Sequence, residues 1–255
     1  MSVSNEPEED GAVDSPKPRG KGVYLLPNLF TTASLFSGFY AVVAAMNGHF
    51  ENAAIAIFVS MILDSLDGRV ARMTNTQSAF GAEYDSLADM VAFGVAPALV
   101  AFSWALSDLG KIGWVAAFIY VAGAALRLAR FNTQIGSTDK KYFVGLPSPS
   151  AAALVAGTVW TLHDVEVTPL MSWMSVFIVA SAGVLMVSNV LFYSFKELDL
   201  KGKVPFMVVL LIVLGFAVVA TAPAQVLLVV FVLYGLSGPY QALLRKRKKQ
   251  GGQGN

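Results

Sequence analysis

The sequence contains no cysteine and few charged residues, and both shortages limit the kinds of protein that it can encode. Without cysteine the chain forms no disulfide bond and offers no thiolate ligand to a metal. Charged residues make up 14% of the chain and hydrophobic residues 55%, whereas a soluble domain has about 25% charged residues. The apolar runs are too long and too continuous for barrel strands. Composition therefore predicts an all-α, polytopic membrane helix bundle.

Histidine is also scarce, and the net charge is close to zero. The two histidines, His49 and His163, fall at the edges of predicted loops, where we expect them to be solvated. The formal net charge of +1 points to no particular partner. We expect no nucleic acid among the partners.

The two ends of the chain differ in composition from the long apolar part between them. Residues 1–22 are acidic and rich in proline and glycine, which predicts a disordered tail. They lack the basic and apolar regions, in that order, of a cleavable signal peptide. Residues 244–255 form a basic tail, also predicted to be disordered. The transmembrane domain is predicted to occupy residues 23–243.

The apolar part divides into eight candidate membrane helices separated by short loops that carry glycine, proline, asparagine or aspartate. The predicted spans are 28–47, 51–71, 82–106, 111–131, 148–163, 169–192, 204–221 and 224–243. The fifth is short for a membrane span, which needs about 20 residues.

The placement of basic residues tests this division. If the N-terminus is cytoplasmic, every one of the 18 lysines and arginines except Lys111 falls in a cytoplasmic tail, loop or helix end. The positive-inside rule predicts such an asymmetry. It supports eight spans in the inner membrane, with both termini facing the cytoplasm.

Four aspartates stand in two regular pairs within the apolar region. Asp64 and Asp67 are three residues apart, and Asp85 and Asp89 are four apart, so each pair shares one face of a helix. The segment between the pairs, GRVARMTNTQSAFG, predicts a tight cytoplasmic turn that brings the pairs together. Four like charges repel one another unless cations lie among them. Carboxylate oxygens suit Mg²⁺, Mn²⁺ or Ca²⁺, and two such ions would neutralise all four.

Two other interpretations of the acids remain open on chemistry alone. They can form an ion or proton pathway in a membrane transporter. They can also form structural ion pairs with arginines, the candidates being Arg69, Arg72, Arg127 and Arg130.

The spacing of eight residues resembles the signature of the CDP-alcohol phosphotransferase family. They are Asp64, Asp67, Gly68, Ala71 and Arg72, followed after eight residues by Gly81, Asp85 and Asp89. The resemblance covers roughly residues 20–206. It implies a helical membrane enzyme, usually a homodimer, in which the aspartates hold one or two divalent ions and the ions hold the diphosphate of a CDP-linked donor. It also implies that Asp89, and with it Asp85, is catalytic, with Asp89 the usual candidate for general base.

The same resemblance assigns residues to the donor. The stretch LLPNLFTTASLFSG looks like the donor-binding start of the family's first membrane helix, although a proline followed by asparagine is also an ordinary helix start. The residues expected to bind the CDP-lipid are Pro27, Asn28, Thr31, Gly68, Ala71, Arg72 and Gly81.

Three further stretches resemble the branch of the family whose acceptor is serine: ALRLARFNT, YFVGLPSPSAAA and FYSFKELDLKGKVPF. A serine carboxylate needs an arginine or lysine. The residues expected to bind the acceptor are Arg127, Arg130, Asn132, Ser148 and Lys196. Arg130 is favoured for the serine carboxylate, and the cations are also candidates for the donor's phosphates. The alternative for these cations is membrane anchoring. Ser148 and Ser150 are also candidate helix caps.

The resemblance thus implies transfer of a phosphatidyl group from CDP-diacylglycerol to L-serine, giving phosphatidylserine and CMP, with Mg²⁺ or Mn²⁺. Two alternatives stay open. One is the same chemistry with glycerol phosphate or inositol as acceptor, or with an ether-lipid donor, and the other is an ion-coupled transporter.

Overall fold

The first half of the chain forms a helical hairpin followed by one long helical rod. A computed structural model describes residues 25–133, 142–193 and 206–251. Helices α1 (Leu25–Met46) and α2 (Phe50–Thr74) form the hairpin. The rod contains α3 (Ala79–Asp89), a π-helical segment η2 (Met90–Val95), α4 (Ala96–Ala101), a second π-helical segment η3 (Phe102–Leu106) and a 3₁₀ turn η4 (Ser107–Leu109).

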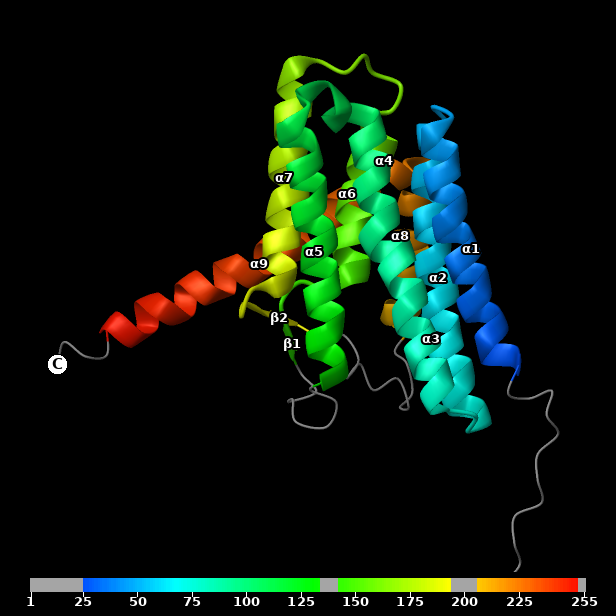
Figure 1. The fold of residues 1–255 in the computed structure, drawn as a ribbon. Coiled ribbons are helices and arrows are strands. Elements are labelled where there is room, and N and C mark those ends of the chain that lie inside the picture. The colour runs from blue at the N-terminus through cyan, green and yellow to red at the C-terminus, as the bar shows by residue number, and fades with distance from the viewer. Residues whose placement is uncertain (1–24, 134–141, 194–205, 252–255) are drawn as a thin grey trace, which may run out of the picture.

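The second half adds helices and one small strand pair. Its helices are α5 (Lys111–Thr133), α6 (Ser148–Leu162), α7 (Pro169–Val187), α8 (Phe206–Thr221) and α9 (Pro223–Gly251). Strands β1 (Tyr142–Val144) and β2 (Leu191–Tyr193) pair antiparallel, with Tyr142 opposite Tyr193. Figure 1 shows most of the helices side by side, with α6 between the α1–α2 hairpin and the α5–α7 pair, while the last part of α9 extends away from the bundle.

The prediction of a multi-pass helical membrane protein is confirmed. Within the described residues, five helical stretches are long and apolar enough to cross a membrane: Leu26–Met46, Ala79–Leu109, Lys111–Thr133, Pro169–Val187 and Pro223–Leu244. The predicted count of eight spans is not reproduced by this criterion. Of the other three, α2 carries the first aspartate pair, and α6 and α8 are shorter, with 15 and 16 residues.

Small residues let the helices approach closely. The buried core around α1, α2, α4 and α6 is dominated by alanines. Two serines on facing sides of α1 and α2, Ser34 and Ser60, are hydrogen-bonded to each other at 2.7 Å. Between α5 and α7, a methyl group on Gly123 would collide with the carbonyl oxygen of Gly183. Small residues and serine hydroxyls are the usual means of packing helices in lipid.

One end of the bundle collects the elements that carry the sequence motif, and we call it the carboxylate end. Figure 1 shows that α1 begins there, that α2 and α3 meet there, and that α5 ends there beside β1 and β2. The turns between α1 and α2 and between α6 and α7 lie at the opposite end.

Three local predictions need correction. The turn between the aspartate pairs is shorter than predicted, because α2 continues past the predicted end at residue 71 to Thr74, where Asn75 adopts a left-handed conformation at φ 50°. The span predicted to reach residue 192 stops at Val187, because Ser188 is extended and leads into β2. The basic segment predicted to be disordered from residue 244 continues α9 as far as Gly251. Residues 1–22 lie outside the described residues.

Candidate functional site

The first pair of aspartates lies on the last turns of α2. Asp67 is 5% exposed, and its Oδ2 accepts a hydrogen bond from the hydroxyl of Thr31 on α1 at 2.8 Å. The same Thr31 hydroxyl lies 3.1 Å from the carbonyl oxygen of Pro27. The start of α1 therefore fixes the orientation of one carboxylate.

The second pair lies on α3, which begins directly after the short turn. Ser78 caps the helix, and its hydroxyl oxygen accepts the backbone N–H of Gly81 at 3.0 Å. Gly81 has little free space, because an added methyl group would lie 3.1 Å from the Ser78 hydroxyl and 3.6 Å from Asn28 Oδ1. Glycine at this position therefore leaves room for the Ser78 cap.

The four aspartates form one carboxylate cluster, consisting of Asp64, Asp67, Asp85 and Asp89. Ligand oxygens of the first three all lie within 4.8 Å of one another. The side chains of Asp64 and Asp89 lie close enough to interact directly. The Oδ1 atom of Asp85 is shielded from the surface and has no hydrogen-bond partner among the described residues. Carboxylates that approach so closely need protons or cations between them, and this donor set fits a hard divalent cation.

A cavity of about 320 Å³ opens beside this cluster, between the start of α1, the end of α2 and the start of α3. Its lining includes every residue that the sequence assigned to the donor: Pro27, Asn28, Thr31, Gly68, Ala71, Arg72 and Gly81. Asp67 and Asp85 face the same space. The cavity thus joins a polar lining to two of the clustered carboxylates.

Sequence reasoning missed other residues of the cavity wall. Thr76, Gln77, Ser78 and Ala82 also line it. Three of them lie in the four-residue connection between α2 and α3. Their position between the two halves of the motif was the available signal, but the longer predicted turn gave no reason to single them out.

Arg127 of α5 lies on the inner side of the carboxylate end. It is half-buried, and its Nη1 donates a hydrogen bond to the hydroxyl of Ser148 at 2.6 Å. Its Nε is shielded from the surface and lacks a partner among the described residues. Asp89 and Tyr234 of α9 lie close enough to act on it electrostatically. Tyr234 was missed because the last two helices carry no recognisable motif.

The other described residues assigned to the acceptor do not form one group, because each contacts a different partner. Arg130 donates to the exposed Asn189 at 3.4 Å, and the exposed Asn132 donates to Ser86 at 3.0 Å. Lys196 lies outside the described residues. Ser148 does not cap α6 through its side chain, because Pro147 occupies the cap position. The serine hydroxyl instead accepts the hydrogen bond from Arg127.

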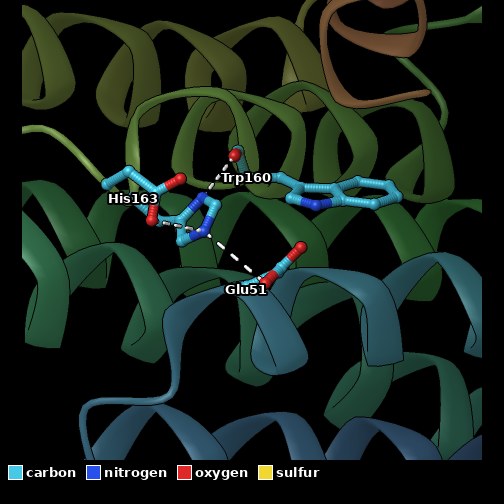
Figure 2. A network of polar contacts seen from close by, with 4 residues as sticks. Glu51, Trp160 and His163 are labelled. Atoms are coloured by element: carbon cyan, nitrogen blue, oxygen red, sulfur yellow. Dashed lines mark hydrogen bonds and ion pairs between the residues drawn. The ribbon is translucent and has the colours of Figure 1, made fainter. Parts of the chain in front are cut away.

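A second polar network lies at the opposite end of the bundle and links α2 to the end of α6. Figure 2 shows His163 beside Glu51 and the backbone oxygen of Trp160. The Nε2 atom lies 3.6 Å from Glu51 and 3.0 Å from Asp164, and Nδ1 lies 2.7 Å from the Trp160 oxygen. His163 is therefore a partly buried helix-end contact rather than the solvated residue predicted. Its position far from the cluster argues against a part in the same chemistry.

Comparison with known proteins identifies relatives over most of the chain. The family model described as CDP-alcohol phosphatidyltransferase matches residues 24–181. A Helicobacter pylori protein named CDP-diacylglycerol–serine O-phosphatidyltransferase is 39% identical over 84% of this chain and 90% of its own length. Proteins of the same name from Saccharomyces cerevisiae and Methanocaldococcus jannaschii are 38% and 40% identical, each over 54% of this chain and over 54% and 62% of their own lengths.

Proposed function

The chain belongs to the CDP-alcohol phosphatidyltransferase family, and from this premise we propose that it transfers a phosphatidyl group from CDP-diacylglycerol to L-serine. The products are phosphatidylserine and CMP. The observation that carries the proposal is the 39% identity, over 84% of this chain, to a protein whose name specifies both substrates. The carboxylate cluster and the adjoining cavity supply the polar groups that this reaction needs at the end of a membrane bundle.

The donor occupies the cavity in this proposal. Its acyl chains stay in the bilayer, and its cytidine diphosphate enters between the start of α1 and the turn between α2 and α3. Gly68 leaves room for a ligand in this cavity, because an added methyl group there would come near only Arg72, at 3.9 Å. Arg72 faces the same cavity and can pair with a phosphate.

Asp64, Asp67 and Asp85 would hold a divalent cation, Mg²⁺ or Mn²⁺ with Ca²⁺ as the alternative, and Asp89 would complete a site for one or two ions. The close oxygens of the first three support this assignment, as does the Oδ1 of Asp85, which has no partner in the part of the chain that the structure describes. When bound, the cation neutralises the diphosphate and the charge that develops on the departing CMP.

The acceptor approaches from the side of α5. The hydrogen bond from Nη1 to Ser148 holds the guanidinium of Arg127 still, and Nε, which has no partner among the described residues, can receive the serine carboxylate. Asp89, which lies near Arg127, takes the proton of the serine hydroxyl as the oxygen attacks the lipid-bearing phosphorus. The bond from that phosphorus to CMP then breaks.

An acceptor screen tests the proposal. The purified chain, in micelles with CDP-diacylglycerol and Mg²⁺ or Mn²⁺, is expected to release CMP only when serine is present. CMP release with glycerol phosphate or inositol instead would assign the same chemistry to another acceptor. An ether-linked donor tests the lipid. No CMP release under any condition would favour the ion-coupled transporter.

The arginine pair of α5 gives a prediction about serine binding. Arg127→Ala is expected to raise the serine KM by about one to two orders of magnitude, because a charge-assisted hydrogen bond contributes roughly 1.5–3 kcal/mol. Arg127→Lys should recover only part of the loss, because lysine lacks the guanidinium fork. Steady-state kinetics with each substrate varied in turn measures both.

Arg130→Ala is the matched control, because Arg130 lies on the same helix and contacts the exposed Asn189. It should change the serine KM much less. If Arg127→Ala weakens the CDP-lipid and leaves the serine KM unchanged, Arg127 is a phosphate ligand. If Arg130→Ala alone raises the serine KM, the carboxylate belongs to Arg130.

The distribution of basic residues gives a prediction about orientation. Both tails should face the cytoplasm of a cell whose inner membrane holds the chain, and Lys111 should face the other side. The absence of native cysteine allows single cysteines at residues 10, 111 and 253 to be labelled in intact cells. Only the cysteine at 111 should react with an impermeant reagent. Reaction at 253 from outside would contradict the predicted orientation.

The resemblance also predicts a homodimer. Cross-linking in native membranes tests the dimer. This test is separate from the activity tests, because the carboxylate cluster and the cavity both lie within one chain.

A further inference from the structure

A fully buried tyrosine packs against the segment that follows the last aspartate of the cluster. Tyr120 of α5 is 0% exposed and is the largest of the fully buried side chains. Its hydroxyl donates a hydrogen bond to the carbonyl oxygen of Phe93 at 3.0 Å. Phe93 belongs to η2, the π-helical segment that begins one residue after Asp89.

The Phe93 carbonyl cannot receive the donor that an α-helix would give it, for a reason visible in the sequence. In an α-helix it would accept the N–H of the residue four positions later, but that residue is Pro97, which has no N–H. Both residues are buried. The Tyr120 hydroxyl donates a hydrogen bond to this carbonyl, which has lost its α-helical donor.

The π-helical geometry of η2 matters for the direction of Asp89. The backbone N–H of Ala96 bonds to the carbonyl of Val91, five residues earlier, so this stretch is wider than an α-helix. One extra residue in a helical turn rotates the helix that follows the turn by about 100° about its axis, relative to the helix that precedes it. This rotation sets the angle between the face of α3 that presents Asp85 and Asp89 and the buried face of α4.

The same face of α5 contacts this segment at further points. Ala124, four residues after Tyr120, would touch a methyl group on Gly94 at 3.2 Å, so glycine lets α5 lie close to η2. Arg127, seven residues after Tyr120, lies beside Asp89. Tyr120 thus belongs to the face of α5 that packs against η2. This packing sets how Asp89 is oriented relative to Arg127.

We propose that Tyr120 is a positioning residue that holds the π-helical segment in register, so that the Asp89 carboxylate faces both Asp64 and Arg127. The inference rests on the proposed role of Asp89 in the reaction. Tyr120 itself touches neither substrate. It acts through the Phe93 carbonyl and the backbone of η2.

The test replaces the hydroxyl and separates rate from binding. Tyr120→Phe is expected to lower kcat by about 10- to 100-fold, the size of effect that a small misplacement of a reacting group produces. The KM values for serine and CDP-diacylglycerol should stay within about twofold, because the arginine and the cavity are retained. The thermal midpoint of the purified protein is recorded for the same samples.

Ser37→Ala is the matched control. Ser37 is also buried, and its hydroxyl donates to the Ala56 carbonyl at 2.7 Å, so that its hydrogen bond joins α1 to α2 rather than α5 to η2. It should lower the thermal midpoint with little change in kcat. Equal effects of the two variants on kcat would mean that Tyr120 is merely one more structural hydroxyl, and would overturn the proposal.

The double variant Tyr120→Phe/Pro97→Ala decides the matter even if the single variant does not fold. Alanine at 97 gives the Phe93 carbonyl an α-helical donor, so the folded protein should be recovered while the π register is lost. A folded double variant with low kcat supports the proposal, and one with wild-type kcat overturns it. Failure of the wild-type chain to release CMP would instead reject the proposed function, which keeps the two tests distinct.

Discussion

Removal of divalent cations is expected to reduce CMP release to background, and addition of Mg²⁺ or Mn²⁺ is expected to restore it. Without a cation, the clustered carboxylates present like charges to an anionic diphosphate. The oxygens of Asp64, Asp67 and Asp85 lie within 4.8 Å of one another, which is close enough for one ion to contact all three. CMP release during titration with a chelator, followed by titration with each metal, measures the effect.

Two variants connect this loss to the cluster. Asp64→Asn should raise the metal concentration needed for half-maximal activity and should weaken the donor as well. Glu83→Gln, which alters an exposed acid on α3 outside the cluster, should leave both unchanged. Full turnover in excess chelator would remove the metal from the proposal. A normal metal response in Asp64→Asn would remove that residue from the site.

The aspartate cluster was predictable from the sequence because helical spacing places side chains three or four residues apart on one face. Short polar segments between apolar runs favour antiparallel neighbours, so the two pairs were expected to meet. The structure reproduces this meeting at the junction of α2 and α3. What failed was the extent of the connecting turn. The stretch Arg69–Met73 contains good helix formers, and it continues α2 until Asn75.

The choice between the two arginines of α5 could not be made from spacing. Arg127 and Arg130 are three residues apart and share one broad face of the helix. Packing against the start of α6 distinguishes them, because Ser148 bonds Arg127, whereas Arg130 reaches Asn189. The sequence favoured Arg130, and the local contacts favour Arg127. Tertiary contacts between distant segments of this kind leave no local periodic signal.

The π-helical segment was also hidden from sequence reasoning. Hydrophobic periodicity over a membrane span is weak, because almost every position is apolar, so a wide turn does not disturb the pattern. Pro97 indicated that one carbonyl would lose its helical donor. Nothing nearby in the sequence indicated that Tyr120, on the next helix, would replace it.

The substitution Asp89→Asn is expected to lower kcat by roughly 10²- to 10⁴-fold, the usual contribution of a positioned general base. Asparagine keeps the size of the side chain but has no basic oxygen to accept the serine proton. The KM for serine should change little if Arg127 holds the carboxylate. Steady-state kinetics at saturating metal, with purified protein in micelles of CDP-diacylglycerol, gives both quantities.

The metal response of this variant separates two roles for Asp89 that its position alone leaves open. A carboxylate that binds a cation is a poorer base, so a pure ligand and a pure base should behave differently. Asp85→Asn, made in the partner residue on α3, provides the comparison, and its lost activity should be partly recovered by a higher metal concentration. Asp89→Asn should stay slow at every metal concentration if the residue is the base. Recovery of Asp89→Asn by metal to the same degree as Asp85→Asn would make Asp89 a ligand, and the proton of serine would then have to leave by another route.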